Sequence, residues 1–115
     1  MMTWRIENYK TKDDNDPVEE WLSGLPDKKL VSVLRSKITS LSKNGFQLLQ
    51  TKAMKHIGGE DENLYELIGG AGRITVYFDQ ARRVFILINA FRKTRKKQTD
   101  KISEARRYLH EYLDR

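Results

Sequence analysis

The sequence predicts an α+β fold, in which a small antiparallel β-sheet is flanked by helices in the order strand, two helices, three strands and a final helix. Three observations lead to this prediction. Apolar residues recur at three- and four-residue intervals between residues 27 and 44 and again between 100 and 115, as in amphipathic helices. Residues 64–91 are instead rich in apolar and β-branched side chains, interrupted by the short turns GGAG and DQARR. Helices before and after such a run of strands are typical of the α+β class.

The first two elements are short. The stretch TWRIENY at residues 3–9 alternates apolar and polar side chains, which predicts a half-buried strand. In the next segment Asp16 is placed to cap a helix that has Pro17 at its first position, and Gly24 with Pro26 ends it. The neighbouring aspartates lack the alternation and the terminal Glu of a calcium loop, so they are assigned to helix capping.

The longer elements follow. The main helix is expected from Asp27, and the pair Asn44 and Gly45 supplies its left-handed end. Three strands are expected at residues 64–68, 73–78 and 84–91. The last of these is nearly all apolar, which predicts a central strand. The final helix carries its apolar stripe from Ile102 to Leu113, with Thr99 or Asp100 as its cap.

The composition excludes several functional classes. A chain of 115 residues is large enough to bury one core, so a single domain over residues 1–115 is expected. Cysteine is absent, which excludes disulfides, a thiolate nucleophile and a cysteine-based zinc site. The first ten residues include charged side chains and no apolar core of a signal peptide, and no run of about eighteen apolar residues occurs, so a soluble cytoplasmic protein without a membrane segment is predicted.

The positive charge is concentrated in the last third of the chain. Residues 1–81 hold 11 Lys or Arg against 12 Asp or Glu, whereas residues 82–115 hold 11 against 4, a net charge of +7. Eight of these cations lie in the stretch NAFRKTRKKQTDKISEARR, residues 89–107. Such a field attracts polyanions, which favours nucleic acid as a partner over a neutral metabolite. A solvated surface that aids solubility is the alternative explanation.

Five motifs carry a family resemblance. In order, PVEEWLSGLP, LYELI, GRITVYF, FILINAFRKTRKK and ISEARRYLHEY span the chain from about Val18 to Tyr112. This series resembles the HigB branch of the RelE-type toxin superfamily, the toxin halves of bacterial toxin–antitoxin pairs. The resemblance implies a RelE-like, microbial-RNase-like fold, which agrees with the α+β prediction. It also implies ribosome-dependent cleavage of messenger RNA and inhibition by a cognate antitoxin.

The same resemblance implies a set of catalytic residues. Arg73 matches the basic residue at the start of the middle strand, Lys93 the lysine after the apolar strand, and Lys97 a second lysine four residues later. Glu66 matches an acidic position that has no assigned role. Because arginine does not deprotonate in proteins, Arg73 is assigned to transition-state charge stabilisation. A lysine crowded by other cations can transfer protons, so Lys93 or Lys97 is assigned that step, with the choice between them open.

Further residues are candidates for binding RNA. The expected phosphate contacts are Lys52, Lys55, His56, Arg92, Arg95 and Lys96. Tyr65 and Tyr77 are candidates for base stacking, with core packing as the alternative for both. Adjacent Tyr77 and Phe78 must point to opposite faces of one strand, so one of them belongs to the core.

The chain departs from the family pattern at three points. Ile68 replaces the arginine of the usual LYELR, Thr99 stands where many relatives have proline after the basic run, and the cleft tyrosine of some RelE relatives has no counterpart. These departures weaken the transfer of a fixed mechanism and leave the fold prediction intact.

Partners follow from the resemblance. A HigA-like helix-turn-helix antitoxin is expected, in a heterotetramer of two toxins and two antitoxins, with operator DNA bound only through the antitoxin. Messenger RNA on the ribosome is the expected target, bound on a concave basic face of the sheet. No metal-ligand spacing occurs, so no metal or other cofactor is expected. Two alternatives stay open: a non-catalytic basic nucleic-acid-binding module, such as a phage-derived regulator, and a toxin that damages another target.

Overall fold

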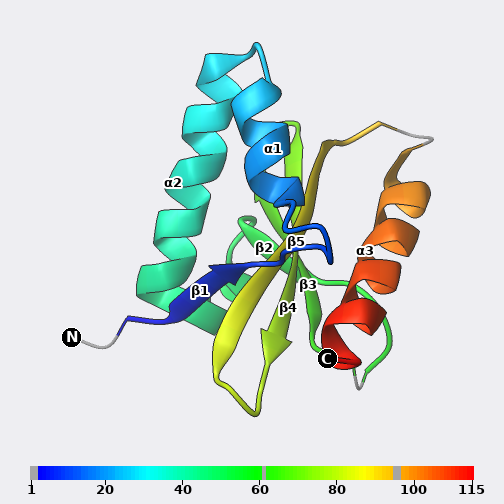
Figure 1. Ribbon diagram of the computed structural model, residues 1–115. Coiled ribbons are helices and arrows are strands. Elements are labelled where there is room, and N and C mark those ends of the chain that lie inside the picture. Colours follow the sequence, from blue (N-terminus) through cyan, green and yellow to red (C-terminus); the bar gives the residue numbers. More distant parts are fainter. Residues whose placement is uncertain (1–2, 61, 95–96) are drawn as a thin grey trace.

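The described residues contain five strands, which form one sheet, and three α-helices that pack on it (Figure 1). The computed structural model describes residues 3–60, 62–94 and 97–115. In chain order the elements are β1 (Arg5–Asn8), α1 (Pro17–Gly24), α2 (Lys28–Asn44), a 3-10 helix η1 (Gly45–Gln50), β2 (Met54–His56), β3 (Leu64–Gly69), β4 (Gly72–Asp79), β5 (Val84–Arg92) and α3 (Lys97–Leu113). This order confirms the predicted α+β class and adds η1 and β2.

The strands lie in the order β1-β5-β4-β3-β2. From β2 to β5 each strand is antiparallel to its neighbour, as the short turns require. β1 differs, because it pairs with β5 in parallel. The predicted antiparallel sheet is therefore confirmed from β2 to β5, and the parallel pairing of β1 is a difference at its edge. Apolar alternation reports which face a side chain takes, and it carries no information on the direction of a strand's neighbour.

The strand β2 was not among the predicted elements. It has three residues, of which Met54 is buried and Lys55 and His56 are exposed. A segment this short contains too few alternations to distinguish a strand from a polar loop. Its pairing with β3 brings Lys55 opposite Glu66, which matters for the site described below.

Local signals position the helix ends. The side chain of Asp16 accepts a hydrogen bond from the Glu19 N–H at 2.9 Å, and that of Asp27 accepts from the Leu30 N–H at 3.0 Å, so both predicted caps are confirmed. Gly45 ends α2 with a φ of 56°, a conformation that glycine tolerates best. The predicted caps of the final helix are wrong, because α3 begins at Lys97 and includes both Thr99 and Asp100.

Helices cover the two faces of the sheet. Figure 1 shows α1 and α2 on one side and α3 on the other. The first side holds the larger apolar cluster, built around Leu22, Leu34 and Phe85, and the second holds a smaller cluster around Ile86, Ile88 and Ala105. In the described part of the chain, no helix is long and apolar enough to cross a membrane.

Candidate functional site

A row of polar side chains crosses the sheet on the face that α3 covers. Lys55 in β2 lies opposite Glu66 in β3, Glu66 opposite Thr75 in β4, and Thr75 opposite Asn89 in β5. Directly paired residues of neighbouring strands share a face. The Asn89 amide contacts α3, which identifies the face. We call Lys55, Glu66, Thr75 and Asn89 the polar row.

A β-bulge brings Asn89 into this row. Thr75 pairs with Asn89 and Val76 with Leu87, so Ile88 is an extra residue on β5. Ile88 belongs to the apolar cluster beneath α3, and Asn89 donates from Nδ2 to the Lys101 carbonyl at 2.9 Å and to Glu104 Oε1 at 3.0 Å. Consecutive side chains of β5 thus point to the same face.

Glu66 is the centre of the site. Its side chain is 0% exposed, which is costly for a carboxylate unless cations and donors surround it. Lys55 Nζ lies 3.6 Å and Arg73 Nε 3.4 Å from Glu66 Oε1. Gln98 of α3 donates from Nε2 to Oε1 at 3.3 Å and to Oε2 at 3.1 Å. Side chains from β2, β4 and α3 therefore converge on this one carboxylate.

The Arg73 guanidinium is held from two sides. Its Nη1 donates to the carbonyl oxygens of Gly70 and Gly72, each at 2.8 Å, which uses both of that nitrogen's hydrogens. Its Nε is buried and, although 3.4 Å from Glu66 Oε1, it makes no hydrogen bond of good geometry. We treat that contact as an ion pair. Among the described residues no hydrogen bond involves Nη2, so this nitrogen is the donor left for a ligand.

Two acceptor atoms of the polar row lack partners. Thr75 Oγ1 and Asn89 Oδ1 are buried and form no hydrogen bond with any described residue. Buried polar groups are nearly always paired, so unpaired ones in adjacent strands mark a site rather than ordinary core. The described residues contain no group of three His, Asp or Glu side chains that could hold a metal ion.

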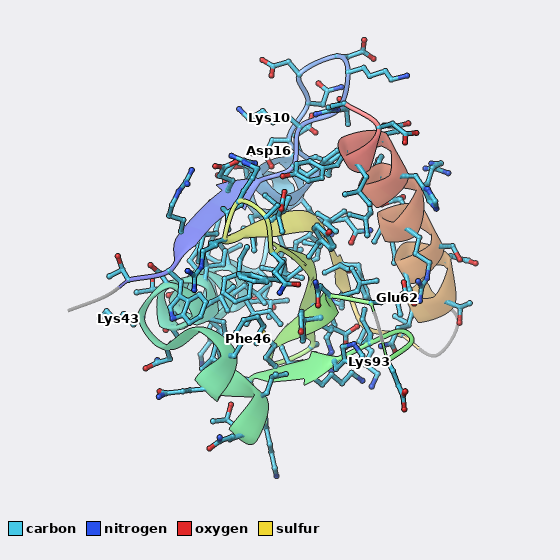
Figure 2. All side chains as sticks on the ribbon, turned by 90° about the horizontal axis from the view of Figure 1, so that it is seen from below. Lys10, Asp16, Lys43, Phe46, Glu62 and Lys93 are labelled. Atoms are coloured by element: carbon cyan, nitrogen blue, oxygen red, sulfur yellow. The ribbon has the colours of Figure 1, made fainter. Side chains whose placement is uncertain are left out.

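Exposed cations lie at the end of the sheet next to Arg73. The backbone N–H of Lys93 donates to the Ala71 carbonyl at 2.8 Å, so Lys93 sits beside the same β3–β4 turn that supplies the Arg73 carbonyls. Its side chain is exposed. Arg92 is also exposed and pairs with Asp27 at 3.2 Å. Figure 2 shows Lys93 on the side of the strands nearer to α3, and Lys43 and Phe46 nearer to α2 and η1.

The other predicted residues are distributed differently. Lys97 is the first residue of α3, and its side chain lies outside the described part of the structure, as do Arg95 and Lys96. Lys52 is exposed and lines a shallow groove with Lys37 and Ser40 of α2. These residues are therefore not brought together with Arg73 by any contact that the structure describes.

The predicted aromatic and histidine residues lie elsewhere. The Tyr65 ring is 5.6 Å from that of Phe46 and 5.4 Å from that of His56, on the face that α2 and η1 cover. His56 Nε2 lies 2.7 Å from the Glu62 carbonyl oxygen. Tyr77 is on the α3 face but packs against Tyr112, whereas Phe78 belongs to the core beneath α1 and α2. As predicted, adjacent Tyr77 and Phe78 take opposite faces.

Among the described residues, the face of the sheet that carries the polar row does not form the concave basic surface that was predicted. α3 covers the face that carries the polar row, and the Arg73 side chain is 11% exposed. Three residues of the site, Thr75, Asn89 and Gln98, were not among the candidates. Asn89 carried a usable signal, since it is the one polar residue in the apolar strand VFILINAF. Gln98 carried none, because its contact with Glu66 joins residues 32 positions apart.

The fold is shared with solved toxin–antitoxin structures. A RelE–RelB complex from Pyrococcus horikoshii OT3 contains a chain that is 18% identical, with a TM-score of 0.60, 82% of this chain and 99% of that chain being covered. In the RelBE2 complex from Mycobacterium tuberculosis the identity is 15% and the TM-score 0.56, with coverages of 81% and 94%. The molecule thus belongs to the class of small α+β proteins with a RelE-type fold.

Sequence similarity identifies the family to which this chain belongs. Residues 20–109 match the family described as Phage derived protein Gp49-like (DUF891), and the chain belongs to it. A comparison with curated proteins found no match. The RelE-like fold that the predicted resemblance implied is confirmed by the two solved structures. The narrower assignment to the HigB branch stays a prediction.

Proposed function

We propose that this protein is the toxin of a toxin–antitoxin pair, that it acts in the cytoplasm as one toxin domain, and that it cleaves messenger RNA on the ribosome. The family match and the RelE-type fold support the toxin assignment. The concentration of positive charge in residues 82–115 supports RNA as the substrate. The HigB-like mode of action is part of the proposal.

One observation carries the proposal: the Arg73 guanidinium, held by Glu66 and two carbonyls, keeps Nη2 without a partner among the described residues, and exposed Lys93 lies beside the same turn. A fixed guanidinium next to an ammonium suits a phosphate that gains negative charge during the reaction. Because the donors are already oriented, little reorganisation is needed when that charge develops.

The proposed reaction uses the substrate's own 2′-hydroxyl. Its oxygen attacks the adjacent phosphorus, the bond from phosphorus to the 5′-oxygen breaks, and the products are a 2′,3′-cyclic phosphate and a free 5′-hydroxyl. Arg73 stabilises the phosphorane. One of Lys93 and Lys97 takes the proton from the 2′-hydroxyl and the other gives a proton to the leaving 5′-oxygen, with the choice between them open. No metal ion takes part in this scheme.

Binding of the RNA strand is assigned to the remaining cations. In this proposal Lys52, Lys55, His56, Arg92, Arg95 and Lys96 contact phosphates. Tyr65 and Tyr77 offer ring surface for stacking, although each is half-buried and already packs against another aromatic ring. In this proposal the strongest contacts with the RNA lie at the end of the sheet, around Arg73 and Lys93.

The proposed partner is an antitoxin of the HigA-like helix-turn-helix type. Both similar solved structures are complexes of a toxin with its antitoxin, which supports an antitoxin partner for this chain. A heterotetramer with two copies of each protein, bound to operator DNA through the antitoxin, is the proposed assembly. Light scattering on the coexpressed pair measures the stoichiometry, and a mass for a one-to-one dimer would contradict it.

The test compares wild type with Lys93→Ala and Arg73→Ala after induced expression in a bacterium, followed by primer extension on an abundant messenger RNA. We expect codon-phased cuts with wild type and weak or no cuts with either variant. Lys43→Ala is the matched control, since Lys43 is an exposed lysine on α2. Lys93→Ala is the deciding variant, because removing Arg73 leaves buried Glu66 with fewer cations and can cost about 3–5 kcal/mol of stability.

A second candidate function is supported by the low exposure of Arg73. A guanidinium that is 11% exposed and paired with Glu66 also suits a structural role, as in a non-catalytic nucleic-acid-binding module. That function predicts salt-sensitive RNA binding with neither growth arrest nor cuts. Growth arrest without cuts would instead indicate a toxin with another target. The same expression experiment separates all three outcomes.

A further inference from the structure

Glu66 makes an unusual combination of contacts. In the described part of the chain it is the one charged side chain that is fully buried. Its neighbours are two cations, of which Lys55 is 48% exposed and Arg73 11% exposed, and the Gln98 amide. A buried carboxylate in the middle of a sheet is retained against a large desolvation cost, and replacing such a group by apolar residues is often neutral or stabilising. Stability alone therefore does not account for it.

We infer that Glu66 is a positioning residue: it holds the Arg73 guanidinium, and with it Nη2, in the orientation that the substrate phosphate requires. This inference rests on the proposed function and assigns a role to a residue that otherwise has none. Arg73 has a long side chain with several rotatable bonds, and Nη1 alone is anchored by hydrogen bonds, to the Gly70 and Gly72 carbonyls. The ion pair at Nε supplies the second point of attachment.

The geometry argues against a direct catalytic role for Glu66. A general base must come within about 2.6–3.2 Å of the hydroxyl whose proton it removes. Glu66 Oε1 already lies against Lys55, Arg73 and Gln98, and Oε2 accepts from Gln98. With the side chain at 0% exposure, no substrate atom can reach either oxygen in this arrangement. Glu66 can influence the reaction through Arg73 and Lys55, which border it.

The contact with Gln98 extends the same argument to α3. Gln98 lies in the first turn of α3, and its amide reaches both oxygens of Glu66. Asn89 of the polar row donates to Lys101 and Glu104 of the same helix. Glu66 thus contacts side chains from β2, β4 and α3 at one point. These contacts restrict how far α3 can move away from the β3–β4 turn whose carbonyls bind Arg73.

The kinetic test is a double-mutant cycle with Glu66→Gln and Arg73→Ala. Single-turnover cleavage of a defined messenger RNA is measured against ribosome concentration. Glu66→Gln should lower the maximal rate about 10- to 100-fold, as loss of an orienting partner typically does, with little change in the ribosome concentration at half-maximal rate. In the Arg73→Ala background Glu66→Gln should have no further effect on the rate. An equal reduction in both backgrounds would show that Glu66 acts independently of Arg73 and would overturn the inference.

A second readout does not depend on cleavage. In 15N-labelled protein, the Arg73 Nε–H group, which lies against Glu66, should be well ordered, and Glu66→Gln should lower its order parameter. Glu19→Gln is the control, because it breaks an exposed ion pair with Arg35 on α2 and should leave the Arg73 signals unchanged. An Arg73 Nε–H order parameter that stays unchanged in Glu66→Gln would overturn the inference, even if wild type cleaves RNA.

Two further variants cover a failure to fold. If Glu66→Gln does not give a cooperative thermal transition, Glu66→Asp retains the charge, and Arg73→Lys retains a cation without the planar fork. Both should reduce the maximal rate and leave ribosome affinity near that of wild type, and normal rates in both would contradict the positioning role. If wild type itself does not cleave RNA, the proposed function fails, whereas the NMR comparison still decides whether Glu66 orients Arg73.

Discussion

The Tyr9 hydroxyl donates a 2.8 Å hydrogen bond to Glu111 Oε2, joining residues 102 positions apart. Tyr9 follows β1, and its backbone N–H donates to the Leu87 carbonyl at 2.8 Å. Its ring stacks on Tyr108 at 5.0 Å. The residue that follows the parallel edge strand β1 therefore contacts α3 directly, on the face of the sheet that α3 covers.

Stability at alkaline pH should depend on Tyr9. Burial, together with the hydrogen bond to the Glu111 carboxylate, raises the pKa of Tyr9 to about 12 from an ordinary value of 10.0. Because the folded-state pKa is raised, the stabilisation is complete below pH 10 and is lost as the pH rises toward 12. Tyr9→Phe should cost about 1 kcal/mol at pH 7 and should flatten the decline above pH 10. Urea unfolding at pH 7, 9 and 11 measures both effects, and an unchanged decline in the variant would contradict the assignment.

Stability at acid pH should depend on Asp79. The hydrogen bond from the Tyr112 hydroxyl, at 2.7 Å, and the backbone N–H of Arg82 lower the pKa of Asp79 from an ordinary value of 3.8. A lowered folded-state pKa gives stabilisation that is present above pH 3.8 and is lost as the pH falls below it. Asp79→Asn should therefore be less stable than wild type at pH 6, with the difference shrinking toward pH 3. Thermal unfolding across that range tests this, and a constant difference would contradict it.

Gly72 should not tolerate a side chain. A Cβ at this position would lie 2.5 Å from Leu34 Cδ1 and 3.1 Å from Leu34 Cγ, inside the core beneath α2. Gly72→Ala should cost about 1–3 kcal/mol through overpacking. Gly24→Ala is the matched control, because a Cβ there meets nothing within 4 Å. Thermal unfolding followed by circular dichroism compares the two, and equal melting temperatures would contradict this packing.

Lys93→Ala should separate RNA binding from folding. Its exposed side chain forms no ion pair with any described residue, so the substitution should change the free energy of unfolding by less than about 0.5 kcal/mol. It should also weaken RNA binding and reduce the slope of log affinity against log salt by about one. Lys43→Ala should leave that slope unchanged, since Figure 2 shows Lys43 near α2, away from Lys93. Fluorescence anisotropy with a labelled RNA at several salt concentrations measures the slopes.

Interactions within a few residues explain why most elements could be predicted. The Asp16 and Asp27 side chains cap helices three residues ahead, and these contacts are local. The short turns between β3, β4 and β5 likewise leave an antiparallel arrangement as the available pairing. The start of α3 was placed three or four residues late, because Thr99 and Asp100 resemble cap residues although they lie inside the helix.

The site could be predicted in part. Arg73, Glu66 and Lys55 were among the candidates. In the structure, Arg73 and Lys55 both lie against the Glu66 carboxylate. The resemblance suggested the residue types, while their contacts depended on the register between β2, β3 and β4. His56 was a candidate for phosphate contact and Tyr65 for base stacking, yet both lie on the face opposite to Glu66 because side chains alternate along a strand.

The amino-acid sequence by itself determined the type and order of the main elements, the caps of α1 and α2 and the charge asymmetry, because these depend on neighbours along the chain. Tertiary structure alone decided the parallel direction of β1, the burial of Glu66 and the low exposure of Arg73. The physical reason is that burial and pairing join residues far apart in sequence: Gln98 meets Glu66 across 32 positions, and α3, the last element of the chain, packs on the face that carries the polar row.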